Sequence, residues 1–165
     1  FRRTFDQVAS RDPSIGTDYG YIDAFTQWIT RNPEHYDVVV TSNMFGDIAT
    51  DLASILQGGM GMAGSGNIGD DHAFFEPVHG SSPKYAGMNK VNPIASINSV
   101  QMMTDWLGRR NQDEELLEIS KLIELSVEDH LKEGKLLTYD LGGTASCSAV
   151  GDAIASKLEQ KLSEL

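Results

Sequence analysis

The sequence has one cysteine, no long apolar run and few basic residues. The single cysteine, Cys147, excludes an intrachain disulfide and fits a reducing compartment. No apolar run is long enough to span a bilayer, and no basic-then-apolar leader opens the chain. The formal net charge is −11 without a visible basic patch, which argues against a nucleic-acid partner. We therefore expect a soluble, cytoplasmic protein with no membrane or nucleic-acid partner.

The chain is nevertheless long enough to fold around a core. Its 165 residues include 40% apolar side chains, which is typical of a globular domain. The basic pairs Arg2-Arg3 and Arg109-Arg110 are interpreted as solvated surface charges and not as phosphate sites. The chain opens at Phe1 in a segment that already resembles the body of a helix. This opening favours a fragment of a longer protein.

The first third predicts helix, strand and helix in succession. Apolar residues recur at helical spacing from Tyr21 to Arg31, which is followed by Asn32-Pro33. The β-branched run from Tyr36 to Thr41 predicts a short buried strand. Ser42 or Asn43 can then cap a helix that continues through Asp51 to about Leu56.

The remainder predicts two long loops, one strand and three helices. Six glycines between Gly58 and Asp71 predict a loop, Ala73 to Val78 a second strand, and His79 to Pro93 a second loop. Loops of this length are usually functional or disordered. Helices are expected over 94–107, ending before Gly108, and over 113–132, ending before Gly134; Ser148 caps a third. Two strands cannot form a full sheet, so an α/β fold would need strands from elsewhere.

Two aspartates mark a candidate metal site. Asp47 and Asp51 are four residues apart on the predicted helix, so both carboxylates project from one face. By spacing alone, the simpler explanation is a solvent-facing helix that carries two acids. The pair follows a predicted buried strand, however, and α/β proteins place ligands at the carboxyl ends of strands. Carboxylates of this kind suit Mg²⁺ or Mn²⁺.

The segment from Tyr36 to Ser54, which contains Asn43-Met44-Phe45-Gly46-Asp47, resembles the signature of the isopropylmalate and isocitrate dehydrogenase family. The resemblance implies that Asp47 and Asp51 bind the metal, and that Asp23 on the preceding helix reaches across a homodimer interface to join them. Asn43 would line the cleft for substrate and cofactor. The implied fold is the carboxy-terminal half of this α/β family, a mixed sheet flanked by helices.

The second loop resembles the family's adenosine-binding loop and not a Rossmann fingerprint. Taken alone, a single histidine in a loop is more often structural. The resemblance instead implies contacts of His79 and Asn92 with the adenosine, and Lys84-Tyr85 favours NADP over NAD because lysine can meet a 2′-phosphate. Tyr139 and Asp140 belong to the last cofactor segment, but Gly143 stands where an arginine is expected. The predicted cofactor residues are Glu76, His79, Gly80, Ser82, Lys84, Tyr85, Asn92, Tyr139 and Asp140.

The resemblance implies metal-dependent, NAD(P)-linked oxidative decarboxylation of a 2-hydroxy di- or tricarboxylate. The family's base lysine and acid tyrosine match no segment here, so we expect the isolated chain to be inactive. Residues 1–58 would belong to a small, dimer-forming domain and residues 59–165 to the large cofactor domain. Cys147 is interpreted as a small packed thiol.

The substrate stays open at this point. Most motifs favour 3-isopropylmalate, the substrate of a step in leucine biosynthesis, whereas Lys84-Tyr85 and Lys90-Val91-Asn92-Pro93 favour isocitrate, and Ser42-Asn43 also occurs in tartrate and malate relatives. Two alternatives of other classes remain. The chain could be a non-catalytic binding or assembly module, or a structural α/β domain with accidental motif matches.

Overall fold

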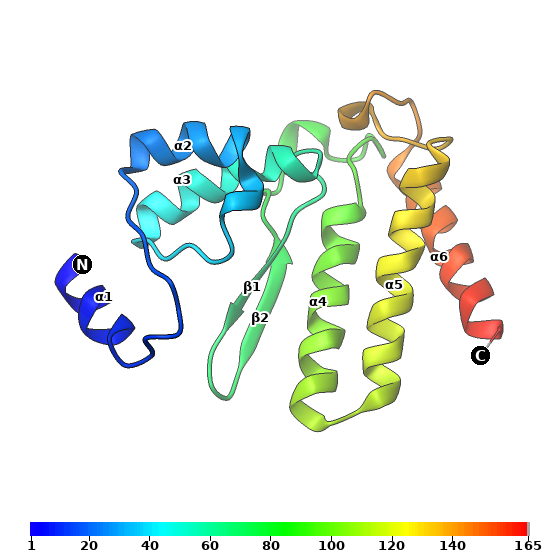
Figure 1. Ribbon diagram of the computed structural model, residues 1–165. Helices are drawn as coiled ribbons and strands as arrows, with labels where there is room; N and C mark the ends of the chain where they lie inside the picture. Colours follow the sequence, from blue (N-terminus) through cyan, green and yellow to red (C-terminus); the bar gives the residue numbers. More distant parts are fainter. Residues whose placement is uncertain (165) are drawn as a thin grey trace. The chain divides into compact units, whose positions relative to one another are not determined.

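A computed structural model describes residues 1–164, and the chain divides into two compact units, Phe1–Ala49 and Thr50–Leu165 (Figure 1). The boundary falls within helix α3 (Asn43–Ala53), so Asp47 belongs to the first unit and Asp51 to the second. The division that the family resemblance predicts, after residue 58, concerns the family's domain layout and stays a prediction.

The first unit is built from short helices. These are α1 (Arg2–Ala9), α2 (Ile22–Arg31) and the start of α3, and the predicted helices over the same segments are confirmed. Neither α1 nor α2 has a buried residue. The ring of Phe25 lies edge-on to that of Tyr36, with centroids 5.1 Å apart, and this contact connects α2 to the turn that follows it.

The strand predicted from Tyr36 to Thr41 is wrong for this structure. The segment has no regular secondary structure, and its central residue Val38 is 86% exposed. A β-branched run becomes a strand only when a neighbour satisfies its backbone groups and covers its side chains. Among residues 1–164 only β1 and β2 pair as strands. The buried strand that supported the metal assignment is therefore not formed here.

The second unit contains an antiparallel hairpin of β1 (Gly64–Ile68) and β2 (Ala73–Pro77), in which Gly66 pairs with Phe75. Strand β2 is confirmed, but β1 corrects the loop expected between Gly58 and Asp71. Its glycines allow close packing, because a Cβ at Gly64 would lie 3.1 Å from the backbone nitrogen of Ser99. Within the described residues the sheet consists of these two antiparallel strands, so residues 1–164 supply only a small part of the mixed sheet that the resemblance implies.

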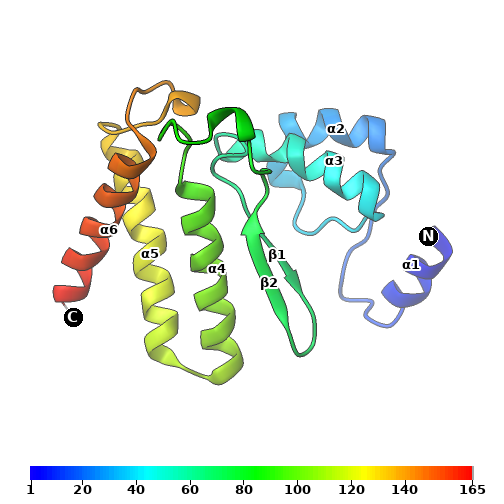
Figure 2. The same cartoon turned by 180° about the vertical axis from the view of Figure 1, so that it is seen from behind.

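Three long helices complete the second unit: α4 (Ile94–Asn111), α5 (Glu114–Glu133) and α6 (Cys147–Ser163). Figures 1 and 2 show α4 between the hairpin and α5, with α6 against the other side of α5. The core lies where these helices meet, around Met62, Ile94, Val127, Val150 and Ile154. Burial of these apolar side chains is the main stabilising contribution in such a unit.

The helix ends confirm some predictions and correct others. Asp113 caps α5 by accepting a hydrogen bond from the Leu116 amide at 3.1 Å, and Gly134 ends it in the left-handed region. Gly108 does not end α4; it is buried inside the helix, where a Cβ would lie 2.8 Å from the side chain of Leu117. The cap of α6 is Ser146 and not Ser148, because Ser146 accepts from the Ala149 amide at 3.2 Å.

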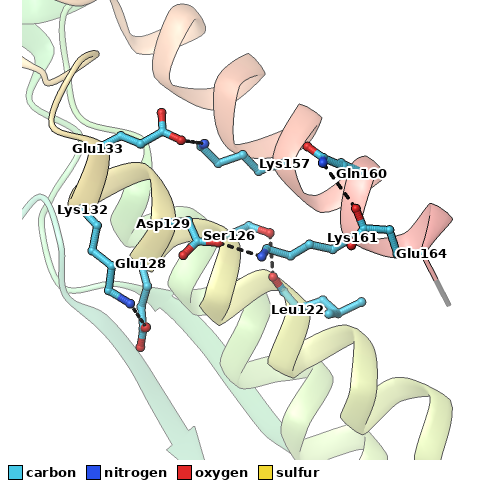
Figure 3. A network of polar contacts seen from close by, with 10 residues as sticks. All are labelled: Leu122, Ser126, Glu128, Asp129, Lys132, Glu133, Lys157, Gln160, Lys161 and Glu164. Atoms are coloured by element: carbon cyan, nitrogen blue, oxygen red, sulfur yellow. Dashed lines mark hydrogen bonds and ion pairs between the residues drawn. The ribbon is translucent and has the colours of Figure 1, made fainter.

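Ion pairs connect α5 to α6 on the exposed side of these helices (Figure 3). Lys161 contacts Asp129 at 2.7 Å, and Lys157 pairs with Glu133. Each interaction lowers the pKa of the acidic partner, because the ammonium group donates a hydrogen bond to the carboxylate.

Among the described helices, none has the length and apolar character needed to cross a membrane.

Candidate metal and cofactor sites

Helix α3 carries both aspartates of the predicted metal site. Asp47 and Asp51 are exposed, and their four-residue spacing on a continuous helix places the carboxylates one turn apart on one side. Asn43 is the first residue of the same helix and is also exposed. A divalent ion such as Mg²⁺ takes one or two carboxylates and fills its remaining positions with water or substrate, so this donor pair fits such an ion.

The third predicted metal ligand, Asp23, lies on another helix. It lies in the first turn of α2, and one of its carboxylate oxygens accepts a hydrogen bond from the Ala24 amide at 2.8 Å. Residues 1–164 contain no group of three His, Cys, Asp or Glu side chains placed to hold a metal. The assignment of Asp23 across a homodimer interface remains a prediction.

Two predicted cofactor residues meet in the second unit although they lie far apart in the sequence. The amide nitrogen of Asn92 donates to Oδ2 of Asp140 at 3.0 Å, and Oδ1 of Asn92 accepts from the Ile94 amide at 2.9 Å. Asn92 is only 6% exposed, so its amide is held in one orientation. The end of the second loop is thereby fixed to the segment that follows α5.

Two residues that the sequence interpretation missed support this junction. The buried hydroxyl of Thr138 donates to Oδ1 of Asp140 at 2.5 Å, so both carboxylate oxygens are engaged. Gly61 leaves room for them, because a Cβ there would lie 2.7 Å from Oδ2 of Asp140. The two-residue spacing between Thr138 and Asp140 was a usable signal for a local hydrogen bond. No pattern in the sequence connected Gly61 with either.

A second junction brings together the predicted residues Tyr85 and Tyr139. Their ring centroids are 5.7 Å apart at an angle of 45°, and the ammonium of Lys84 lies 4.8 Å from the centroid of Tyr85. The pKa of Tyr85 is lowered, first by the hydrogen bond from the Tyr139 hydroxyl and then by the bond from Lys84. The same tyrosine–tyrosine hydrogen bond raises the pKa of Tyr139. Lys84, Tyr85 and Tyr139 therefore form one polar surface.

The other predicted cofactor residues lie in β2 or in the loop that follows it. No hydrogen bond or ring contact within residues 1–164 joins them to this surface. Glu76 is exposed near the end of β2, and Nδ1 of the half-buried His79 forms a hydrogen bond with the carbonyl of Gly80 at 2.9 Å. Ser82 has a φ of 42°, an uncommon value for serine, at the start of the turn Pro83–Tyr85. Their roles stay predictions.

Comparison with known proteins identifies the family. The isocitrate/isopropylmalate dehydrogenase family matches residues 1–154. A homoisocitrate dehydrogenase of Methanocaldococcus jannaschii is 40% identical over 98% of this chain and 44% of its own length. A 3-isopropylmalate dehydrogenase of Beutenbergia cavernae is 40% identical over 96% and 43%. The crystal structure of isocitrate dehydrogenase from Methylococcus capsulatus superposes with a TM-score of 0.84 at 34% identity, covering 93% of this chain and 44% of that one.

The chain belongs to the isocitrate/isopropylmalate dehydrogenase family. The family and the fold class predicted from the motifs are both confirmed, since the solved relatives share the fold. The chain spans less than half the length of the curated relatives it matches. The relatives carry the names of dehydrogenases with three different substrates, and the family alone does not select among them.

Proposed function

We propose that this chain carries the cofactor-binding and metal-binding parts of a decarboxylating dehydrogenase that uses NADP in preference to NAD. The observation that carries the proposal is the double junction between residues 84–92 and residues 138–140. The hydrogen bond of Asn92 with Asp140 and the ring contact of Tyr85 with Tyr139 bring four of the predicted nucleotide residues together in pairs, which supports the proposal. The dehydrogenase names of the relatives support the same reaction class.

The proposed reaction has two stages. A hydride leaves the hydroxyl-bearing carbon of the substrate for the nicotinamide and the hydroxyl loses its proton, which gives a β-keto acid and a reduced cofactor. The carbon–carbon bond to the β-carboxylate then breaks, CO₂ departs, and the remaining enolate takes up a proton. A bound Mg²⁺ or Mn²⁺ supplies Lewis-acid polarisation of the substrate oxygens. We assign Asp47 and Asp51, with Asp23 from a second copy in a homodimer, to hold that ion.

The chain's own cofactor residues have binding roles in this scheme. His79 and Asn92 contact the adenosine, Asp140 lies beside it, and Lys84 with Tyr85 meets a 2′-phosphate. Glu76, Gly80 and Ser82 shape the loop, and Asn43 lines the cleft. The base lysine and acid tyrosine are not among these residues, so the isolated chain binds nucleotide without turning over substrate.

For the substrate we propose 3-isopropylmalate, supported by the motifs around Met44-Phe45 and Glu76 to His79. Isocitrate is the second candidate, because Lys84-Tyr85 and Lys90-Val91-Asn92-Pro93 favour it. Homoisocitrate is included as a third test substrate because a relative with 40% identity is named homoisocitrate dehydrogenase. All three are 2-hydroxy di- or tricarboxylates, so the proposed metal chemistry is common to them.

The test uses the product of the complete reading frame, assayed for reduced nicotinamide with each substrate, Mn²⁺, and NADP⁺ or NAD⁺. We expect turnover with one substrate, a preference for NADP⁺, and loss of turnover in Asp47→Asn. Asp152→Asn on α6 is the matched control and should remain active. Nucleotide binding without turnover on any of these substrates would contradict the proposed enzyme and favour a non-catalytic module.

A further inference from the structure

Two lysines in the second unit form no ion pair with a carboxylate of the described residues. This unit contains nine Lys and Arg residues, and seven of them form ion pairs: Arg109, Arg110, Lys121, Lys132, Lys135, Lys157 and Lys161. Lys84 and Lys90 form none with any carboxylate of residues 1–164. In a chain with a net charge of −11, two neighbouring cations without an acidic partner form a local positive site.

Both ammonium groups lie against the tyrosine pair. Nζ of Lys90 is 4.6 Å from the centroid of Tyr139 and 5.7 Å from that of Tyr85, while Nζ of Lys84 is 4.8 Å from the centroid of Tyr85. The electron-rich ring faces attract the ammonium groups, but the rings carry no net negative charge that would neutralise them. Both lysines are exposed, so their N–H donors are available to a ligand.

Asp140, which follows Tyr139 in the sequence, forms no ion pair with either of these lysines in the described part of the chain. Its two carboxylate oxygens accept hydrogen bonds from Thr138 and Asn92, at 2.5 Å and 3.0 Å. No ion pair connects Asp140 with a lysine among the described residues. The carboxylate therefore contributes to the structure of the junction, and the two ammonium groups remain for an external anion.

The backbone beside Lys90 is held in place by Asn89. The carbonyl of Asn89 accepts from the Cys147 amide at 2.9 Å, its Oδ1 accepts from the Ser148 amide at 2.9 Å, and its Nδ2 donates to Oγ of Ser148 at 2.8 Å. Asn89 has a φ of 50°, which asparagine tolerates better than most residues. These hydrogen bonds hold the backbone next to Lys90 against the first turn of α6.

Position 143 is a glycine and supplies no cation, although the family resemblance predicts an arginine there. A Cβ at Gly143 would overlap the carbonyl oxygen of Leu137, so no larger side chain fits this backbone. The residue that the sequence interpretation expected there, an arginine, is thus excluded by the local structure. A second cation for a phosphate at the tyrosine pair has to come from another segment, and Lys90 is the exposed cation that lies over the Tyr139 ring.

We propose that Lys90 is a specificity-determining residue which, together with Lys84, binds the 2′-phosphate of NADP. A phosphomonoester carries close to two negative charges and three acceptor oxygens, which matches two ammonium donors beside two phenol groups. The inference rests on the proposed nucleotide function and adds to it a residue that acts on the 2′-phosphate alone.

The test measures calorimetric binding of 2′,5′-ADP (adenosine 2′,5′-bisphosphate) and of 5′-AMP, which differ only in the 2′-phosphate. We expect the chain to bind 2′,5′-ADP more tightly. Lys90→Gln should weaken 2′,5′-ADP binding about tenfold and leave 5′-AMP binding unchanged, and Lys90→Arg should retain affinity because its charge is kept. Lys121→Gln is the matched control, since it removes the same charge from a lysine already paired with Glu124.

The outcomes separate the two proposals. Equal weakening of both nucleotides in Lys90→Gln, or no weakening of either, would overturn the role of Lys90 while the nucleotide function stands. If the unaltered chain bound neither nucleotide, the proposed function would fail and the role of Lys90 with it. Raising the salt concentration should reduce the advantage of 2′,5′-ADP over 5′-AMP, because exposed charges are screened.

Discussion

The side-chain amide of Asn92 donates to the carboxylate of Asp140 at 3.0 Å and joins two segments that are 48 residues apart in the sequence. The same amide accepts from the Ile94 backbone, at the first residue of α4. One buried side chain thus fixes both the start of a long helix and the contact between the two predicted cofactor segments.

Replacing Asn92 should therefore destabilise the fold. Asn92→Ala leaves the Ile94 amide without its acceptor and Asp140 without one donor, so we expect a loss of about 1–3 kcal/mol in the free energy of unfolding. Urea denaturation of the chain measures this loss. Asn111→Ala, at the exposed end of α4, is the control and should change stability by less than about 0.5 kcal/mol. Equal effects of the two substitutions would show that the Asn92 hydrogen bonds contribute nothing measurable.

The helices of the second unit could be predicted because their signals are local. Asp113 and Gly134 bound an apolar period, and the structure ends α5 at these residues. Strands depend on partners that local patterns do not specify. Gly64 to Ile68 lacks a strand composition yet pairs with β2, whereas Val38 to Val40 has the composition and stays exposed and unpaired among the described residues. In both segments, tertiary context and not residue composition determined whether a strand formed.

The candidate cofactor site was predictable only as far as the family motifs reach. The motifs selected Asn92, Tyr85, Tyr139 and Asp140, and the structure brings these residues together in two junctions. The exclusion of a side chain at Gly143 follows from a backbone approach between residues 137 and 143 that has no sequence signature. The position of Lys90 over two rings likewise depends on the folded loop.

Gly143 provides a second test of the packing in this unit. The atoms nearest to it belong to the backbone of Leu137, which cannot shift as a flexible side chain can. A methyl group there overlaps the Leu137 carbonyl, which itself accepts a hydrogen bond from the Ala145 amide at 2.8 Å. We expect Gly143→Ala to destabilise the chain by about 1–3 kcal/mol through overpacking, measured by urea denaturation.

Gly151 supplies the matched control for that substitution. It lies within α6, and a Cβ there meets nothing within 4 Å. Gly151→Ala should stabilise the chain by about 0.5–1 kcal/mol, because alanine loses less backbone entropy in a helix. If Gly143→Ala were also neutral or stabilising, the tight approach to Leu137 would be refuted.

The ion pairs between α5 and α6 predict a dependence of stability on pH. The pKa values of Asp129 and Glu133 are lowered in the folded chain by Lys161 and Lys157. A carboxyl group with a depressed folded pKa adds stability above its ordinary pKa, here 3.8 for Asp129, and this stability is lost as the pH falls through the folded value. Lys161→Gln should therefore lower the urea midpoint at neutral pH and converge with the unaltered chain in acid.

Two controls accompany the measurement on Lys161→Gln: a change in salt concentration and a substitution of Lys121. High salt should reduce the difference between Lys161→Gln and the unaltered chain, since the pair is partly exposed. Lys121→Gln removes a pair within α5 and leaves the contact between α5 and α6 intact. A difference that persisted unchanged into acid would show that Lys161 stabilises the helices by packing and not by its charge.

The tyrosine pair predicts a measurable change in phenol ionisation. The phenolate of Tyr85 is stabilised first by the Tyr139 hydroxyl and then by Lys84, so the pKa of Tyr85 lies below its ordinary value of 10.0. Spectrophotometric titration of tyrosinate should show a component below that value. Tyr85→Phe should remove it, and both Tyr139→Phe and Lys84→Gln should shift it upward because each removes one stabilising donor.

Tyr21→Phe is the control for this titration, because Tyr21 is 86% exposed and lies in the first unit. It should leave the component below 10.0 in place. Binding of 2′,5′-ADP should shift that component upward, since a phosphate that takes up Lys84 and Lys90 brings negative charge close to the phenolate. A component that 2′,5′-ADP leaves unmoved, at concentrations where calorimetry shows binding, would place the 2′-phosphate away from the tyrosine pair.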